Sequence, residues 1–276
     1  MASGGFFIAG LAASWFLSSR HIQIGVKNGF KAMQDHSYLP LSGVRVIDFG
    51  QQIAGPAVAM VLADLGATVI HIDPPTGAQW KHQANAILNR NKRCLTIDLK
   101  SAQGLDQALQ LIDQADVVLE SFRPGVMQRL GIDFAQLRES RPELITLSVP
   151  GFASNDALRS QWKATEAVVA ATAGAFTDMG FNRVLMGLNP CFSPLPLASS
   201  YTVTLAASSV VLALLARHDS GYGDHIEVPV VAAMMEGLSY NSYEVADLPC
   251  LLYTSDAADD SLRVGLGGRR IIKKGV

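Results

Sequence analysis

The sequence is poor in charge and in cysteine, and it has no excess of basic residues. Charged residues make up 17% of the 276 positions and the formal net charge is −2, so no general attraction to nucleic acid or to an anionic membrane is predicted. The three cysteines, Cys94, Cys191 and Cys250, are odd in number and far apart. This pattern argues against a disulfide framework and favours a reducing compartment, the cytoplasm.

Metal-ligand spacing and membrane-type segments are also lacking. The six histidines form no ligand pattern, and we expect no bound metal. Phe6–Leu17 is apolar, but it is too short to span a bilayer and has no basic residue before it, so neither a membrane span nor a signal peptide is favoured. The longer apolar run 198–217 contains Ser and Thr residues, which favour a helix buried in a protein core.

Strands and helices alternate in the part of the sequence that does carry a pattern. Val44–Phe49 and Thr68–Asp73 are apolar and β-branched, as in strands that are buried on both faces. Between them, Pro56 suits the first turn of a helix and Gly66 suits a left-handed cap at its end. A strand, a helix and a strand in about thirty residues predict a right-handed βαβ crossover, and the loop after its first strand is where such sheets bind ligands.

The same alternation continues along the chain. Further strands are predicted at 94–99, 115–120, 144–149 and 225–231. Helical segments are predicted after Ser101 and at 126–130, 134–140, 162–174, 198–217 and 232–245. This order predicts an α/β fold with a Rossmann-like, mostly parallel, doubly wound sheet.

Both ends of the sequence depart from this pattern. Residues 1–38 fit poorly with the rest of the chain and are interpreted as an N-terminal extension. The tail contains CLLYTSDAADD and GGRRII, which look like a translated sequencing adapter and the primer sequence that comes after one. We therefore interpret 250–276 as a read-through artefact, and 39–249 as a domain fragment that is truncated before its small domain is complete.

Four segments of this sequence resemble one enzyme family. They are PLSGVRVIDFGQQIAGPAVAMVLADLGATVIHIDPP, NRNKRCLTIDLKS, ADVVLESFRPGVMQRLGI and RHDSGYGDHIEV. With them, the chain resembles the family III CoA-transferases, which include formyl-CoA transferase, carnitine CoA-transferase and α-methylacyl-CoA racemase. The resemblance implies a Rossmann-like large domain, a smaller second domain, and an interlocked homodimer or an intramolecular pseudo-dimer. It also implies acyl-CoA and a small carboxylic acid as substrates.

Nine residues are predicted to bind coenzyme A. Its pyrophosphate and 3′-phosphate call for Arg and Lys beside backbone donors at strand ends. A single Arg or Lys at such a place is better explained as an ordinary solvated surface charge. Four of them, however, lie within the family motifs: Arg93, Lys100, Arg123 and Arg129. The resemblance adds five positions that line the CoA site: Ile53, Ala54, Ile97, Ser121 and Phe122. No G-x-G-x-x-G follows the first strand, so a dinucleotide dehydrogenase is poorly supported.

The catalytic position differs from the family pattern. Family transferases use an Asp before the long helix, and counting back from Arg217 places that position at Ser199. A carboxylate forms a mixed anhydride that a thiolate can reopen, whereas a serine would form an ordinary ester. No base lies near Ser199 in the sequence and G-x-S-x-G is absent, which favours a structural role such as a helix cap over a nucleophile. Glu166 matches a family carboxylate near the acyl site and is either an auxiliary catalytic group or a capping or surface residue.

Several functions are compatible with the resemblance. The first is a CoA-transferase with altered catalytic machinery. The second is a non-catalytic CoA-binding half of a fused two-copy protein, as in the dimethylsulfoniopropionate CoA-transferase/lyase type, in which the other half carries the Asp. An acyl-CoA racemase would need a proton-transfer pair, and the sequence displays no convincing His–Asp arrangement. An unrelated Rossmann-like binding protein would make the long motif match accidental.

Overall fold

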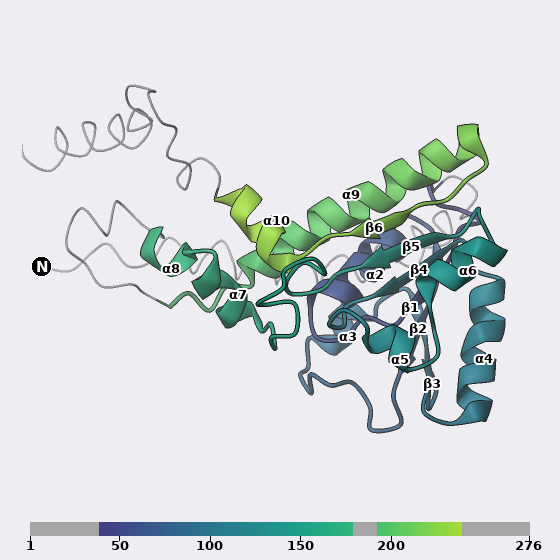
Figure 1. The fold of residues 1–276 in the computed structure, drawn as a ribbon, viewed down its shortest axis with the longest axis horizontal. Coiled ribbons are helices and arrows are strands. Elements are labelled where there is room, and N and C mark those ends of the chain that lie inside the picture. The colour runs from purple at the N-terminus through teal and green to yellow at the C-terminus, as the bar shows by residue number, and fades with distance from the viewer. Residues whose placement is uncertain (1–38, 179–191, 239–276) are drawn as a thin grey trace, which may run out of the picture.

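A computed structural model describes residues 39–178 and 192–238 (Figure 1). The predicted extension at 1–38 and the predicted artefact at 250–276 lie outside these ranges. In the described part, six strands form one sheet in the order β3-β2-β1-β4-β5-β6, and every neighbouring pair is parallel. The predicted fold class is therefore confirmed. The strands are β1 Arg45–Asp48, β2 Thr68–Asp73, β3 Lys92–Thr96, β4 Val117–Glu120, β5 Ile145–Ser148 and β6 His225–Glu227.

Helices cover both faces of the sheet. Alternate residues of the central strands point to opposite faces, as strand geometry requires. Val46 and Val117 pack in a core cluster with α2, α9 and α10, while Ile47 and Val118 pack with α4, α5 and α6 (Figure 1). The helices are α2 Ala54–Asp64, α3 Asn85–Leu88, α4 Ala102–Asp113, α5 Val126–Arg129, α6 Phe134–Ser140, α7 Glu166–Thr172, α8 Ala175–Asp178, α9 Leu197–Ser220 and α10 Val230–Gly237.

The order of the strands creates a crevice between β1 and β4. The chain adds β2 and β3 on one side of β1 and then returns to add β4, β5 and β6 on the other. At such a switch point the loops that leave the two central strands run in opposite directions, so a ligand can enter between them. The Phe49 N–H donates to the Leu119 carbonyl across this pair at 2.9 Å, which fixes where the two loops begin.

Most predicted elements are confirmed, and the chemistry at the helix ends explains several of their limits. Ser101 caps α4, because its side chain accepts a hydrogen bond from the Gly104 N–H at 3.0 Å. Gly66 follows α2 with a φ of +104°, in the left-handed region where glycine is favoured. β2 and α6 have the predicted limits.

Several boundaries were predicted wrongly, and three of them have a clear local cause. The third strand spans Lys92–Thr96 and begins before the predicted residue 94, because it lies at the edge of the sheet and its mostly exposed residues form no apolar pattern. α7 begins at Glu166 rather than at 162. Thr165 caps this start, because its side chain accepts a hydrogen bond from Val168 N. Val230 starts α10 instead of extending the last strand, because Pro229 donates no ladder hydrogen bond and suits a helix start.

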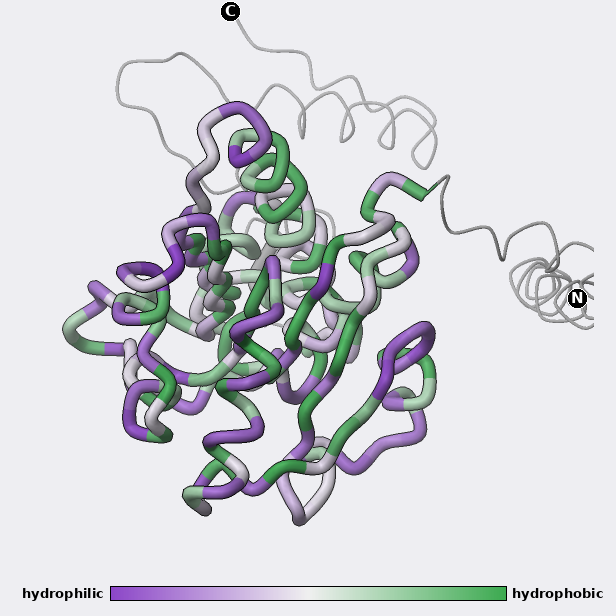
Figure 2. Tube along the Cα trace, turned by 90° about the vertical axis from the view of Figure 1, so that its right-hand side faces the viewer, coloured by the Kyte–Doolittle hydropathy of each residue, from purple (hydrophilic) through white to green (hydrophobic). Residues whose placement is uncertain are grey.

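The long helix α9 lies against the core with one face. By length and composition alone it would also pass for a membrane span. It packs along α2 and α10, and its buried residues include Ala206 and Val210, while Leu212 and Leu215 on another face are 64% and 62% exposed. Figure 2 shows the hydrophobic stretches gathered along the central strands and this helix. The predicted core helix is therefore confirmed for one face of α9 and not for the whole circumference.

Candidate functional site

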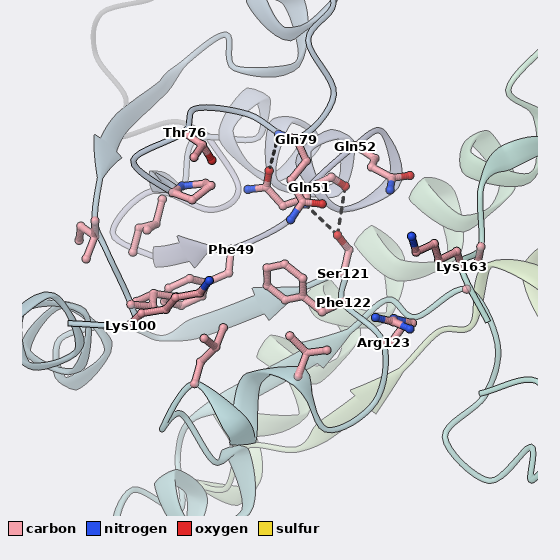
Figure 3. A pocket seen from close by; sticks show the side chains of 18 of the residues that line it. Phe49, Gln51, Gln52, Thr76, Gln79, Lys100, Ser121, Phe122, Arg123 and Lys163 are labelled. Atoms are coloured by element: carbon pink, nitrogen blue, oxygen red, sulfur yellow. Dashed lines mark hydrogen bonds between the residues drawn. The ribbon is translucent and has the colours of Figure 1, made fainter. Parts of the chain in front are cut away.

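Two adjoining cavities open at the carboxyl edge of the sheet. The larger has a volume of about 680 Å³ and is bounded by the loops that follow β1, β2, β3 and β4 and by the segment before α7 (Figure 3). The smaller, of about 80 Å³, lies between the loop after β1 and the N-termini of α7 and α9. We call them the outer and the inner cavity. They share six residues, Gln51, Gln52, Ser121, Gly151, Ala164 and Thr165, so a ligand in one borders on the other.

The loops after β1 and β4 meet through Ser121. Its hydroxyl accepts from the Gln51 N–H at 2.8 Å and donates to the Gln51 carbonyl at 3.1 Å (Figure 3). This approach requires glycine at position 55, because a Cβ there would lie 2.8 Å from the Ser121 side chain. Gln52, which follows Gln51 in this loop, has a φ of +65°, in the left-handed region. The wall between the two cavities is thus fixed by hydrogen bonds from backbone to side chain.

A second contact ties the loop after β2 to the same wall. The Gln51 side chain is 6% exposed, and its Oε1 accepts from the Gln79 N–H at 3.2 Å (Figure 3). Sequence reasoning missed Gln51, Thr76, Gln79 and Lys163, all of which line the outer cavity. Gln51, Thr76 and Gln79 could have been found because they follow predicted strands. Lys163 does not closely follow a strand, so the sequence gives no signal for it.

Beneath this wall lies a buried group of charges. The Asp48 carboxylate accepts from Gly50 N at 2.7 Å, lies 2.8 Å from His71 Nδ1 and accepts from Lys92 Nζ at 2.9 Å. Lys92 also donates to the Pro56 carbonyl at 2.7 Å, and both the Lys92 and Asp48 side chains are fully buried. Burial alone would raise the pKa of Asp48, but the charges and hydrogen bonds of Lys92 and His71 lower it overall. These contacts hold β1, β2 and β3 together under the β1 loop.

Seven of the nine residues predicted to bind CoA line these cavities. Ile97, Lys100, Ser121, Phe122 and Arg123 line the outer cavity, and Ile53, Ala54 and again Ser121 line the inner one. Arg93 and Arg129 line neither. Arg93 is the second residue of β3, near the amino end of that strand, because the strand begins earlier than predicted. Arg129 is exposed at the end of α5. The CoA-binding roles of all nine residues remain predictions.

Glu166 and Ser199 are in direct contact at the inner cavity. The Glu166 carboxylate accepts from Ala198 N at 2.7 Å, from Ser199 N at 3.1 Å and from Ser199 Oγ at 2.6 Å. Ser199 was predicted as a cap for the long helix, and this is wrong: α9 begins at Leu197 after Pro196, and Ser199 lies in its first turn. Since Pro196 offers no side-chain acceptor, the first turn of α9 is capped by a carboxylate from α7 instead.

A family comparison identifies the kind of protein that carries this site. The model of CoA-transferase family III matches residues 41–249, most of the chain. The chain belongs to CoA-transferase family III. The four motif segments predicted that the chain is a member of this family, and the family match confirms that prediction.

Two relatives and two solved structures illustrate the likeness. CoA-transferase/lyase DddD from Marinomonas sp. (strain MWYL1) is 75% identical over 217 residues, which are 79% of this chain and 26% of that protein. Probable fatty acyl-CoA transferase Rv3272 from Mycobacterium tuberculosis is 37% identical over 202 residues, 68% of this chain and 50% of that one. A crystal structure of Rv3272 has a TM-score of 0.65 at 34% identity, over 73% of this chain and 57% of its own. A CaiB/BaiF family protein from Brucella suis has the same TM-score at 24% identity, over 84% of this chain and 58% of its own, and shows the fold alone.

The length covered by these matches matters for any functional conclusion. The chain spans about half the length of the Mycobacterium relative and about a quarter of the Marinomonas one. The activity, substrates and partners of a whole family III protein therefore come to this chain only as proposals.

The hydrogen bonds of Glu166 limit what this family III site can do chemically. A nucleophilic carboxylate needs a lone pair free to attack a thioester, whereas the Glu166 oxygens accept three hydrogen bonds, two of them from the positive end of a helix. Ser199 directs its hydroxyl hydrogen to the same carboxylate, which is a weak base for a serine. The geometry suits a cap that shapes the inner cavity better than a nucleophile.

Replacing Glu166 by alanine is expected to lower the free energy of unfolding by about 1–2 kcal/mol, because two N–H groups of α9 and the Ser199 hydroxyl lose their acceptor. Urea denaturation followed by circular dichroism measures the change. Glu139→Ala is the matched control, since Glu139 is an exposed glutamate of α6. Equal effects of the two substitutions would contradict a capping role for Glu166.

Proposed function

We propose that this chain is a CoA-binding, non-nucleophilic unit of a longer family III CoA-transferase that contains two such units. The observation that carries the proposal is the contact between Glu166 and Ser199. The count back from Arg217 assigns Ser199 to the position of the family's Asp, and the carboxylate in contact with Ser199, that of Glu166, is engaged in capping α9. A unit of this kind holds the CoA ester, while the carboxylate that attacks it comes from the other unit.

The outer cavity supports the CoA part of the proposal. It is lined by three cations, Lys100, Arg123 and Lys163, against a single acid, Asp98. Apolar side chains, among them Phe49 and Phe122, line the space between (Figure 3). This combination suits a ligand with an anionic nucleotide end and a long, mostly uncharged pantetheine arm, and the volume is in the range of ligand pockets.

The lengths of the relatives support the two-unit part of the proposal. Matched segments of similar size make up half of the Mycobacterium protein but only a quarter of the Marinomonas protein. The second protein is therefore about twice as long, and it is also the more similar in sequence, at 75% identity against 37%. The family resemblance implies that two units pair, and we expect that this pairing occurs here within one chain.

Two other functions have less support. A self-sufficient CoA-transferase would have to use Glu166 or Ser199 as nucleophile, and their mutual hydrogen bond disfavours both. A racemase needs two groups that exchange a proton with the carbon next to the thioester. Among the described residues that line the inner cavity, Glu166 is the only acidic one and there is no histidine.

The proposal is tested by measuring binding and covalent chemistry on the same purified 276-residue chain. Calorimetry with acetyl-CoA is expected to detect binding, and mass spectrometry after incubation with acetyl-CoA is expected to show no mass increase for an acyl or CoA adduct. A CoA adduct on Glu166 or Ser199 would overturn the non-nucleophilic assignment. Failure to bind acetyl-CoA would overturn the CoA-binding assignment.

Lys100→Met is expected to weaken acetyl-CoA binding about fivefold or more, because the outer cavity loses a cation that would pair with a phosphate of CoA. The matched control is Arg93→Met, since Arg93 also belongs to the basic motif but lies outside both cavities. Calorimetry on both variants measures the difference. Equal weakening by the two substitutions would mean that the nucleotide lies along the outer surface of β3 and not in the outer cavity.

A further inference from the structure

One buried histidine, His71 on β2, has a carboxylate at each of its two ring nitrogens. Nδ1 lies 2.8 Å from Asp48 Oδ2, and Nε2 lies 3.3 Å from Asp73 Oδ1. His71 is 2% exposed, and Asp73 Oδ1 is buried with no hydrogen-bond partner in the described part of the chain, so the ring faces an otherwise unpaired oxygen. An ionised carboxylate can only accept, so both nitrogens suit their neighbours only when both carry a proton. The arrangement therefore fits a histidine that keeps its positive charge while buried.

The charges around His71 balance when its ring is protonated. Asp48 and Asp73 are the two carboxylates, and the fully buried Lys92 on β3 is the other cation, with Nζ 2.9 Å from Asp48 Oδ2. Burial alone would lower the pKa of His71, but the hydrogen bond and the charge of Asp48 raise it overall, helped by Asp73 and opposed by Lys92. A neutral ring would leave one buried negative charge without a counter-charge.

The other groups on the neighbouring elements do not change this balance. Cys94, which is opposite His71 in the register of β3, stays a thiol, because burial and a nearby carboxylate raise its pKa. Arg45 on β1 and Arg93 on β3 alternate to the other face of the sheet. The only titratable residue of α2, which packs on β2 from this face, is Asp64 at its far end. The charge of the His71 ring is therefore set by the two carboxylates and Lys92.

The two carboxylates that His71 joins stand where two loops of the outer cavity begin. Asp48 is the last residue of β1, and Asp73 is the last residue of β2. The loops that follow both line the outer cavity, and they are tied to each other where the Gln51 side chain accepts from Gln79 N at 3.2 Å (Figure 3). A charged His71 is a second tie between the same two loops, at their buried ends.

We infer that His71 is a positioning residue of the CoA site, whose positive charge holds the loops after β1 and β2 at the spacing that binds CoA. The inference rests on the proposed CoA site and adds to it a control by pH. When the ring loses a proton, one nitrogen presents a lone pair to a carboxylate oxygen, and the attraction on that side becomes repulsion. The loops then lose their buried tie, and the outer cavity loses part of its fit to CoA.

The test measures acetyl-CoA affinity by calorimetry on the full chain between about pH 6 and about pH 9. The affinity of wild-type protein is expected to fall about fivefold or more, because the imidazolium is lost as the pH rises through the raised pKa of His71. His71→Gln does not titrate there and is expected to bind, at every pH, as weakly as wild type does at the upper end. His71→Lys keeps a positive charge and is expected to bind tightly throughout. The control is His218→Gln, which changes an exposed histidine of α9 that lines neither cavity and should follow wild type.

A spectrum of the wild-type protein tests the charge without any substitution. Long-range ¹H–¹⁵N NMR is expected to show both ring nitrogens of His71 protonated at about pH 7. A neutral ring at that pH would overturn the inference, whether or not the variants fold. Titration of Glu120 or of the CoA phosphates affects wild type and variants alike, so the difference between their pH profiles belongs to His71.

The outcomes separate this inference from the proposed function. Binding with parallel pH profiles of wild type and His71→Gln would overturn the role of His71 and leave the CoA site standing. Equally weak binding by His71→Gln and His71→Lys would also overturn it, because the shape of the ring and not its charge would then matter. If wild-type protein bound acetyl-CoA at no pH, the CoA site itself would be refuted, and this inference with it.

Discussion

Replacing Asp48 by alanine is expected to cost roughly 3–5 kcal/mol of the free energy of unfolding, a large share of what an ordinary domain has. The substitution removes the counter-charge of Lys92, whose side chain is fully buried, and the hydrogen-bond partner of His71 Nδ1. It also frees Gly50 N, which positions the loop that lines both cavities. Breaking a buried pair by removing one partner leaves an uncompensated charge in a medium of low polarity.

A matched variant separates the lost charge from the lost volume. Asp48→Leu combined with Lys92→Met removes both ions and replaces them with apolar groups, and this double variant is expected to recover much of the stability lost by Asp48→Ala. Urea denaturation of the two variants gives both numbers. If the double variant were as unstable as the sum of its single substitutions, the charge pair would contribute stability beyond mutual compensation, and our account of its role would be wrong.

Replacing Glu120 by glutamine is expected to change the pH dependence of stability by about 2–3 kcal/mol between pH 5 and pH 8. Burial raises the pKa of Glu120 to about 7, against hydrogen bonds from Ser148 and Phe122 N that lower it, and the charge of Glu227 raises it further. The side chain lies at the carboxyl end of β4 and is 6% exposed. In the folded state the carboxyl group therefore keeps its proton at a pH where the unfolded chain, with a pKa near 4.5, has released it.

The direction of the effect is set by proton binding. Because the folded pKa is the higher one, the contribution of Glu120 to stability is fully present below about pH 4.5 and is lost as the pH rises through about 7. Glutamine does not titrate, so the stability of Glu120→Gln should fall less over this interval. Urea denaturation at several pH values measures it, with Glu139→Gln as the exposed control. Parallel pH profiles of wild type and Glu120→Gln would contradict a raised pKa.

Much of the sheet could be predicted because most of its strands are continuous apolar runs in the sequence. The runs that became β1, β2, β4 and β5 are buried on both faces, and burial on both faces is what makes a strand visible in a sequence. Ser101 and Gly66 marked helix ends by local chemistry that does not depend on the rest of the fold. β3 was misplaced because it lies at an edge and its residues are mostly exposed, which leaves no apolar pattern.

The site was predictable only through the family resemblance. Ile53, Ala54, Ser121 and Phe122 were found because the motifs contain them. The charge group beneath the loop was missed because Asp48 and His71 look like interruptions of apolar strands, and only the three-dimensional register brings Lys92 to them. Glu166 and Ser199 are far apart in sequence, so their contact, and with it the capping of α9, required the structure.

The packing of α9 on α2 has a consequence for how the protein is made. α2 belongs to the first βαβ unit of the described chain, but the helix that covers it comes near the end. During synthesis the first unit therefore waits with an apolar surface exposed, which is the state in which nascent chains aggregate or recruit chaperones. The inner cavity also has no closed wall in this interval, because Ser199 arrives with α9. The inner cavity can thus close only when the long helix has docked.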